Sequence, residues 1–471
     1  MKHTKLILGT FILFILYLLS SCEKEVFITD SSAELRFSTD TVFFDTVFTT
    51  IGSTTKRFTV KNTHNNKIKV SSIKLAGGKN SFYRLNINGQ QATSLSNVEI
   101  PANDSLYIFV EVTIDPNNSS NPLVAKDSII FQTNGNIQDI KLISWGQDVH
   151  LIDGKILNTQ TWTADKPYLV YNSALVDTNQ TLTIEAGARI HFHRNSRFYV
   201  AGTLICNGTK ENPVILKGDR LEEDYSDIPG QWDGIWLMPG SKANVINFSE
   251  IKNAIIGIQA DTLGSVTEPT LTLSNSKIEH MSYAGIYAQG TTIKAHNTVI
   301  SDCGSFAVAL TLGGEYEFYH CTVANYWNST TRNTPSVFLN NYYIDINDNL
   351  QIRDLEKALF ANSIIYGNQE NEIGFDYEAG GTFNYSFQSS LLRTDPDTDT
   401  TLTNYQNVLL NENPKFIDAF DYNYQLDTLS PAIDAGNETI GNLYPTDILN
   451  NDRTNDDAPD LGAYERIPGN N

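Results

Sequence analysis

Two histidines have the spacing of a metal-binding pair. His191 and His193 flank Phe192 in an alternating stretch, so both imidazoles would lie on one face of a β-strand. Such a pair holds a metal ion only together with a third ligand, and no third ligand can be named from the sequence. We therefore predict two imidazoles on a solvated outer face and no metal site.

Aspartates crowd the C-terminal end of the chain and raise the question of calcium. Carboxylates are calcium ligands, but their spacing here does not follow the Asp-x-Asp-x-Asp-Gly pattern of a calcium loop. Pairing with Arg453, or the capping of turns, is the favoured interpretation. We predict no cofactor, with calcium as the alternative at Asp447, Asp452, Asp456, Asp457 and Asp460.

Aromatic side chains gather in two segments. The first runs from about residue 326 to 359, and the second is the acidic loop 219–231 together with the residues that follow it. Aromatic rings can stack on sugar rings, although they also pin loops onto a core. The predicted ligand-binding residues are Tyr326, Trp327, Tyr342, Tyr343, Trp232 and Trp236.

The N-terminus predicts export. Lys2 and Lys5 precede an apolar run at 6–19, which as a helix of about 21 Å is too short for a bilayer core of about 30 Å. Leu19-Ser20-Ser21-Cys22 resembles the lipobox of bacterial lipoproteins, which implies a signal peptide at 1–21 and a lipid on Cys22. A membrane partner follows from this, with the protein lipid-anchored in the cell envelope, at the outer membrane, and either periplasmic or surface-exposed. An ordinary secretory signal is the alternative.

The charge argues against nucleic-acid binding, and the cysteine content argues against disulfide and zinc sites. The net charge of −21 argues against nucleic acid, because binding a phosphate backbone requires clustered Lys and Arg. Cys206, Cys303 and Cys321 are odd in number and lack CxxC spacing. Neither a disulfide framework nor a zinc site is expected.

After a polar tether at 22–32, residues 33–150 predict short strands. Apolar residues alternate at period two, for example through Leu106, Ile108, Val110 and Val112, and turn clusters separate the alternating stretches. This pattern favours a β-sandwich. The order of segments 58–62, 100–105, 110–116 and 145–146 resembles immunoglobulin-like modules of the abnormal-spindle and major-sperm-protein type.

From residue 154 the chain becomes repetitive. Six segments superpose position by position, and the steps between them are mostly 22 to 27 residues, a solenoid period. They align an apolar residue with a small residue two positions earlier, which places both on one side of a strand and not on one side of a helix. The small residues are Ser249, Ser276, Thr298, Cys321, Ser363 and Ser390, and the apolar ones are Ile251, Ile278, Ile300, Val323, Ile365 and Leu392.

Stacked strands of this kind predict a parallel coil. Segments 182–187, 202–209, 212–215 and 232–235 resemble the opening coils of pectate-lyase-like right-handed β-helix proteins of bacterial surfaces, and 430–436 with 459–465 resembles their closing motif. The predicted fold class is therefore all-β, with an immunoglobulin-like β-sandwich at 33–150, a right-handed parallel β-helix at 151–440 and a closing segment at 441–471 that covers the last coil.

The resemblance leaves the activity open, because this fold carries lyases, hydrolases, adhesins and inert stalks. An inverting hydrolase of the family would show Gly-His-Gly and Arg-x-Lys, and both are absent. Lys252, Lys277 and Lys294 are as well explained as solvated surface residues, so no catalytic residue is predicted. We expect a binding or structural surface for glycans; the alternatives are a polysaccharide lyase or glycoside hydrolase, and a protein-binding adhesin. The oligomeric state stays open.

Overall fold

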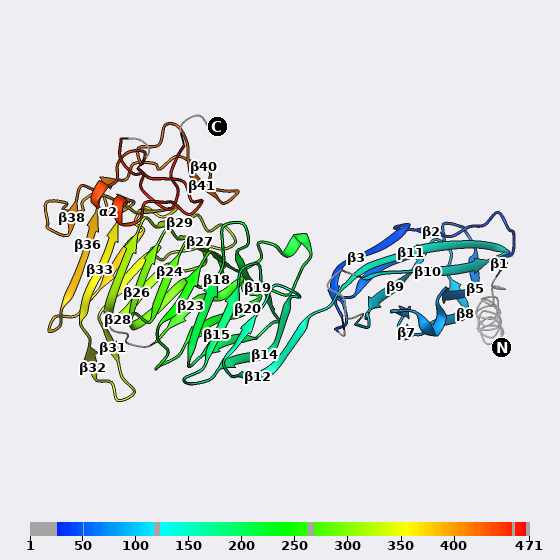
Figure 1. Ribbon diagram of the computed structural model, residues 1–471. Coiled ribbons are helices and arrows are strands. Elements are labelled where there is room, and N and C mark those ends of the chain that lie inside the picture. Colours follow the sequence, from blue (N-terminus) through cyan, green and yellow to red (C-terminus); the bar gives the residue numbers. More distant parts are fainter. Residues whose placement is uncertain (1–25, 50, 117–122, 262–267, 455–456, 468–471) are drawn as a thin grey trace, which may run out of the picture. The chain divides into compact units, whose positions relative to one another are not determined.

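The computed structural model describes residues 26–49, 51–116, 123–261, 268–454 and 457–467. The predicted signal peptide, Cys22 and Asp456 lie outside these residues. The chain folds as two compact units that divide between Asp148 and Val149, and both are built from strands (Figure 1). Within the described ranges, no helix is long and apolar enough to cross a bilayer.

The first unit is an immunoglobulin-like β-sandwich. Inward residues of its two sheets, such as Phe58, Val70, Ile108 and Phe131, pack into one buried cluster, as the period-two alternation predicts. Sheet A contains β1 (Phe27–Ile28), β3 (Thr41–Phe48), β5 (Lys67–Leu75), β8 (Ser94–Ile100), β10 (Leu123–Thr133) and β11 (Asn136–Gln147). Sheet B contains β2 (Arg36–Phe37), β4 (Lys56–Lys61), β6 (Tyr83–Ile87), β7 (Gln90–Gln91) and β9 (Ser105–Val112).

The second unit is a parallel β-helix with three faces (Figure 1). Face 1 contains β13 (Gln160–Trp162), β15 (Thr181–Glu185), β18 (Thr203–Asn207), β21 (Asn244–Asn247), β24 (Leu271–Ser274), the second halves of β26 (Ala284–His296) and β28 (Phe306–Tyr319), β33 (Leu355–Ala361), β36 (Phe383–Gln388) and β38 (Tyr405–Gln406). Face 2 contains the first halves of β12 (His150–Leu157) and β14 (Tyr168–Val176), then β16 (Arg189–Phe192), β19 (Val214–Gly218), β22 (Ser249–Lys252), β25 (Lys277–Met281), β27 (Val299–Cys303), β29 (Thr322–Asn325), β34 (Ile364–Gly367), β37 (Leu391–Leu392) and β39 (Leu409–Leu410). Face 3 contains the second halves of β12 and β14, then β17 (Arg197–Val200), β20 (Trp232–Leu237), β23 (Ala254–Ala260), the first halves of β26 and β28, β30 (Val337–Asn340) and β35 (Ile373–Asp376).

The strand register on face 2 confirms the predicted interior ladder. Each aligned apolar residue pairs with the next one in the series, from Ile251 through Ile278 and Ile300 to Val323, Ile365 and Leu392. The small residues are buried beside them. Their side chains also bond between coils, since the Ser276 and Ser363 hydroxyl oxygens accept from the backbone N–H groups of Ser249 and Cys321 at 3.0 and 3.1 Å.

The turn between faces 1 and 2 explains why each repeat begins with a polar residue. Asn275, Asn297, His320 and Asn362 all have φ of 48° or 49°, in the left-handed region that Asn tolerates better than most residues. The Asn297 amide donates to the Asn275 side-chain oxygen at 3.1 Å. In these four coils the sharp corner therefore depends on polar residues with a left-handed backbone, and Phe248 adopts the same conformation, with φ of 44°, at the corner of an earlier coil.

The long step between two repeats consists of one ordinary coil with two enlarged turns. Strands β30 and β33 stack in register on β28, and a hairpin of β31 (Tyr342–Ile344) and β32 (Leu350–Ile352) extends between them. The segment that the sequence treats as one insertion, about 326 to 359, thus contains two strands of the coil. Only the residues that precede β30 and those around the β31–β32 hairpin are additional to an ordinary coil.

The C-terminal segment differs from the predicted closing segment in both its start and its position. The last strand stacked on the coil is β39, so the segment begins near residue 411 and not at 441. It carries β40 (Phe416–Asp418), β41 (Asn423–Leu426) and α2 (Glu438–Leu443). Its apolar residues pack on the outside of face 2, against Val299, Ala324, Ile364 and Leu391, and therefore cover a flank of the helix as well as its end (Figure 1).

Candidate functional site

Two tryptophans predicted to bind ligand are core residues instead. Trp232 has no exposed surface, stacks on Phe192 at a centroid distance of 3.9 Å, and donates its indole N–H to the Lys252 carbonyl at 2.8 Å. Trp327 is also buried and donates its indole N–H to the Thr330 hydroxyl at 3.0 Å. Their prediction as ligand-binding residues is wrong, because enclosed rings cannot contact a ligand.

The three predicted tyrosines do not form a common surface. Tyr326 lies among Phe416 and other aromatic rings of the C-terminal segment. Tyr342 and Tyr343 are partly exposed on the β31–β32 hairpin, where the Tyr342 hydroxyl donates to Asp376 at 2.9 Å and Arg353 lies over the Tyr343 ring at 5.3 Å. Each of these rings holds a loop in place, which was the alternative interpretation.

Trp236 is the predicted residue that does lie on an open face. It points outward from β20 on face 3 and is partly exposed. Its indole N–H donates to Asp261 Oδ2 at 2.6 Å, and the Arg197 guanidinium lies 5.7 Å from its ring centroid. The ring is thus held in a fixed orientation with one polar edge already satisfied.

Other aromatic rings occupy the same outward position as Trp236 on other coils of face 3. The outward register on face 3 runs through Tyr199, Trp236, Gln259, Tyr287, Ala309 and Phe338. All four aromatic members are partly exposed, and neighbouring positions lie about 4.8 Å apart because they belong to hydrogen-bonded strands. We call Tyr199, Trp236, Tyr287 and Phe338 the aromatic row.

Two further rings widen the row on one side. Tyr283 lies 6.0 Å from both Tyr287 and Phe306, and Phe306 lies 5.4 Å from Phe338, measured between ring centroids. These distances are typical of aromatic pairs in contact. The result is a connected apolar strip across several coils of face 3.

Polar groups accompany the aromatic row at the end that holds Trp236. Asp261 accepts hydrogen bonds from Trp236 and Gln259, and burial raises the pKa of Asp261 above its ordinary value. Arg197 lies 3.8 Å from Asp233. Flat rings beside carboxylates, an amide and a guanidinium provide both the stacking surface and the hydrogen-bonding groups that a saccharide requires.

The repeat in the sequence contains a signal for this row. The pairs Gly257-Ile258, Gly285-Ile286 and Ala307-Val308 mark equivalent inward positions on face 3, and the residue after each pair points outward. The outward residues that directly follow these three pairs are Gln259, Tyr287 and Ala309. Tyr199 and Phe338 join them only through strands β17 and β30, where the repeat is less regular.

A buried ionisable group lies near the end of β25. His280 has no exposed surface; its Nδ1 lies 2.6 Å from Asp302 Oδ2, and its Nε2 lies 3.4 Å from Asp227 of the acidic loop. The ring also meets Tyr422 of the C-terminal segment edge-on at 4.4 Å. Because the imidazole is enclosed, its role is to hold the acidic loop and the C-terminal segment against the coil.

The two histidines of the predicted pair have separate surroundings. His191 is buried, contrary to the predicted solvated face, and burial lowers the pKa of His191 to about 4. His193 lies just after β16, stacks on Tyr171 at 3.9 Å and has Nδ1 2.7 Å from Asp219 Oδ2. Across the residues that the structure describes, no cluster of three or more His, Cys, Asp or Glu side chains could hold a metal ion.

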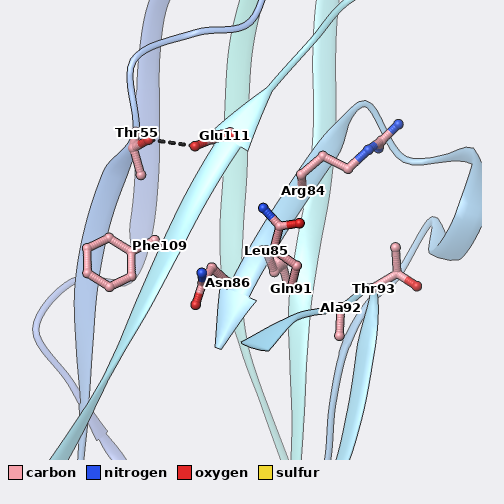
Figure 2. Close-up of a pocket in the computed structure, with 9 residues that line it drawn as sticks. All are labelled: Thr55, Arg84, Leu85, Asn86, Gln91, Ala92, Thr93, Phe109 and Glu111. Carbon is pink, nitrogen blue, oxygen red and sulfur yellow. Dashed lines mark hydrogen bonds between the residues drawn. The ribbon is translucent and has the colours of Figure 1, made fainter. Parts of the chain in front are cut away.

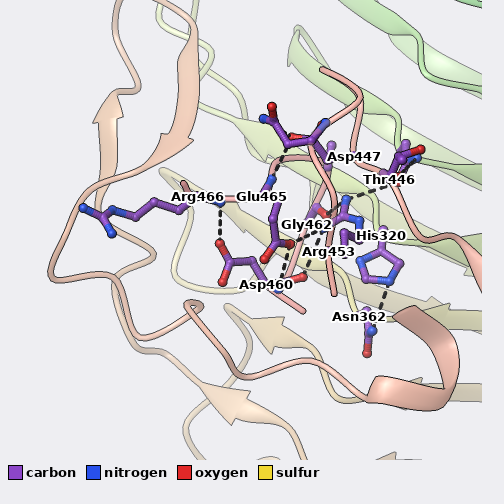
Figure 3. Close-up of polar contacts among 12 residues, drawn as sticks. His320, Asn362, Thr446, Asp447, Arg453, Asp460, Gly462, Glu465 and Arg466 are labelled. Carbon is purple, nitrogen blue, oxygen red and sulfur yellow. Dashed lines mark hydrogen bonds and ion pairs between the residues drawn. The ribbon is translucent and has the colours of Figure 1, made fainter. Parts of the chain in front are cut away.

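Two of the C-terminal aspartates cap turns around a buried arginine (Figure 3). Arg453 bonds to Glu465 at 3.0 Å and to the side-chain oxygen of Asn297 in the coil at 3.1 Å. Asp447 accepts from the backbone N–H of Asn451 at 2.6 Å, and Asp460 accepts from that of Arg466 at 2.7 Å. The aspartates therefore serve the fold of the segment, and the direct ion-pair partner of Arg453 is a glutamate.

Cysteines and lysines contribute no reactive group to the aromatic row. Cys206, Cys303 and Cys321 are buried free thiols, and burial raises the pKa of Cys321 to about 12. Lys252 and Lys294 lie 3.7 Å from Glu279 and Glu317, respectively. These lysines belong to charged surface pairs on faces 2 and 1.

Comparisons with known proteins identify the second unit. Residues 154–268 match the model of the pectate-lyase-like β-helix domain, and residues 256–390 match that of the right-handed β-helix region. No curated protein matches the chain.

Similar solved structures have low scores. A family 123 glycoside hydrolase from Clostridium perfringens that acts on glycolipid glycans has 9% identity over 26% of each chain and a TM-score of 0.19, so the match spans about a quarter of that enzyme. The ASH/PapD-like domain 7 of human CEP192 has 6% identity over 27% of this chain and 96% of its own, with a TM-score of 0.19. The periplasmic chaperone SfaE has 13% identity over 29% and 71%, with a TM-score of 0.17. None of these bears on what the chain does.

Proposed function

Because residues 154–390 belong to the pectate-lyase-like right-handed β-helices, a fold that carries enzymes and binding proteins, we propose that this protein is a cell-envelope lipoprotein that binds glycans on face 3. The lipid would be attached at Cys22, and the β-helix would present the aromatic row to a polysaccharide. The observation that carries the proposal is the alignment of partly exposed rings along face 3. Tyr199 and Trp236 lie on neighbouring coils, and Tyr287 and Phe338 follow on every second coil.

The geometry of the row fits an extended glycan better than a compact ligand. Stacked coils repeat the same outward position at a constant spacing, so rings on several coils can contact several sugar units of one chain. Arg197, Asp233, Gln259 and Asp261 lie at the Trp236 end, where hydroxyl groups of a bound sugar could be fixed. A glycan contacting three or four rings would bind through many modest contacts, each worth roughly 1 kcal/mol.

The test is binding of the full chain to soluble polysaccharides in affinity gels, using uronic and neutral polymers separately. Trp236→Ala with Tyr287→Ala should weaken the retardation by at least about tenfold in dissociation constant, because two stacking surfaces are removed. Phe420→Ala is the matched control, since this ring is 73% exposed on the C-terminal segment, away from face 3. Retention by no polymer, or equal retention of the double variant, would refute glycan binding at the row.

A second candidate function is polysaccharide cleavage on the same surface. Asp261 favours it, because burial raises the pKa of this half-buried carboxyl next to Trp236, and a carboxyl with a raised pKa can take part in acid–base chemistry. The same polymers incubated with the protein distinguish the two functions. Depolymerisation that is abolished in Asp261→Asn would establish the enzyme, and retention without shortening of the polymer supports the binding protein.

A further inference from the structure

The outer surface of sheet B in the first unit contains a hollow of about 560 Å³ (Figure 2). Its floor follows from the strand register: Phe109 of β9 pairs with Asn86 of β6, and Asn86 pairs with Gln91 of β7. These outward side chains lie next to one another on neighbouring strands. Arg84 and Glu111 pair in the adjacent row of the same face and also line the hollow.

The hollow exists because the chain leaves sheet B beside it. Strand β7 has two residues, and the chain then crosses to sheet A, where β8 pairs with β5. The crossing residues are fixed at both ends, since the Ala92 N–H donates to the Leu85 carbonyl at 3.1 Å and the Leu75 N–H donates to the Thr93 carbonyl at 3.0 Å. Ala92 and Thr93 thus form a wall over the edge of the sheet.

One polar atom of the hollow lacks a protein partner. The side-chain oxygen of Asn86 is enclosed and, in the part of the chain that the structure describes, accepts no hydrogen bond. Arg84 and Glu111 are cross-strand neighbours that do not bond to each other. Arg84 donates instead to the Ser81 and Tyr83 carbonyls at 2.7 and 2.8 Å, and Glu111 accepts from the Thr55 hydroxyl at 2.7 Å.

An enclosed amide oxygen without a partner costs free energy unless a ligand or water satisfies it. Amides of Asn86 and Gln91 each offer a donor and an acceptor, the pairing that adjacent sugar hydroxyls require. The Phe109 ring beside Asn86 supplies a flat apolar surface for the C–H face of a pyranose (Figure 2). From these groups we infer that the hollow is a binding site for a neutral saccharide, distinct from the aromatic row of the β-helix.

Two other occupants fit less well. An extended peptide would add to the open edge of β6, but the Arg84 side chain and the Ala92 N–H already engage the Tyr83 and Leu85 carbonyls there. An anionic ligand would meet Glu111 as well as Arg84, so the charges of the rim cancel. A neutral ligand rich in hydroxyl groups avoids both problems.

The experiment uses the full chain and saturation-transfer NMR with cellobiose, maltose, lactose and N-acetylglucosamine as probes. We expect at least one of these sugars to bind, and Gln91→Ala or Asn86→Ala to weaken that binding by about tenfold, as the loss of one buried hydrogen-bonding amide would. Gln90→Ala is the matched control, because Gln90 is the neighbouring exposed amide of β7 and does not line the hollow.

The outcomes separate this site from the proposed function. Trp236→Ala with Tyr287→Ala should remove polysaccharide retention but leave sugar binding at the hollow unchanged. Gln91→Ala should have a smaller effect on polysaccharide retention than this double variant. Binding of none of the four sugars would overturn the inference, and so would binding that Gln91→Ala and Asn86→Ala leave intact. Because Gln91 is exposed on a two-residue edge strand, its variant tests the site without endangering the fold.

Discussion

Trp232 and Trp236 are four residues apart on one strand, and a strictly alternating strand would point both in the same direction. In the structure one is core and the other faces outward, because the alternation breaks at Gly234. Gly234 has φ of 109°, and the register between β20 and β23 shifts directly after it. Such an irregularity re-aims the side chains that follow it, and here it brings Trp236 into the aromatic row.

Gly234→Ala tests whether the break in alternation requires a glycine at this position. A Cβ there would overlap the Ile256 carbonyl oxygen, and the positive φ is itself unfavourable for alanine. We expect the variant to lose about 2 to 4 kcal/mol of unfolding free energy, measured by urea denaturation of the full chain.

The control for this prediction is Gly240→Ala. Gly240 has φ of 97°, but nothing lies within 4 Å of a Cβ at that position. It should therefore show only the conformational cost of about 1 kcal/mol. Equal losses in the two variants would mean that the contact with Ile256 is unimportant.

At the scale of elements, the C-terminal segment depends on a change in the outward positions of face 2. Early coils carry charged residues there, Glu250 and Lys277, whereas later coils carry Val299, Ile364 and Leu391. An outward strand surface that turns apolar must be covered. Residues 411–467 supply this cover, and the buried Arg453 connects them to the coil at Asn297.

Arg453→Met should release the C-terminal segment. The change leaves Glu465 buried without its partner, which typically costs about 3 to 5 kcal/mol, whereas Arg453→Met with Glu465→Met removes both charges and should recover much of that loss. The measurement is the rate of limited proteolysis within residues 411–467.

Arg466→Met is the control for this experiment, because the Arg466 side chain extends away from the network (Figure 3). It should leave proteolysis at the wild-type rate. If the double variant were cleaved as fast as Arg453→Met, the ion pair would not be what secures the segment.

At the scale of the whole molecule, the prediction to test is the lipid anchor at Cys22. If Cys22 carries a lipid, the protein expressed in a bacterial host should partition into the detergent phase of Triton X-114, and Cys22→Ala should move it to the aqueous phase. Ser21→Ala keeps a small residue before the cysteine and should partition like the wild type. Identical partitioning of all three proteins would contradict the lipoprotein prediction.

The all-β class, the two units and the interior ladder of the β-helix can all be predicted from the amino-acid sequence. These features follow from period-two alternation and from a repeat in which each coil aligns like residues with like, so local pattern and global fold agree. The structure divides the two units between Asp148 and Val149. The same patterns also correctly placed Cys321 inside the coil.

Which aromatic residues face solvent, and where the C-terminal segment covers the coil, depends on long-range packing. Trp232, Trp236 and Tyr326 look alike in the sequence, yet a break in alternation turns Trp236 outward and the C-terminal segment covers Tyr326. Long-range contacts of this kind, such as Arg453 with Asn297, join residues far apart in the chain. The spacing of residues along the chain does not predict such contacts. They depend on how many coils lie between the two residues and on which face of the β-helix each residue lies.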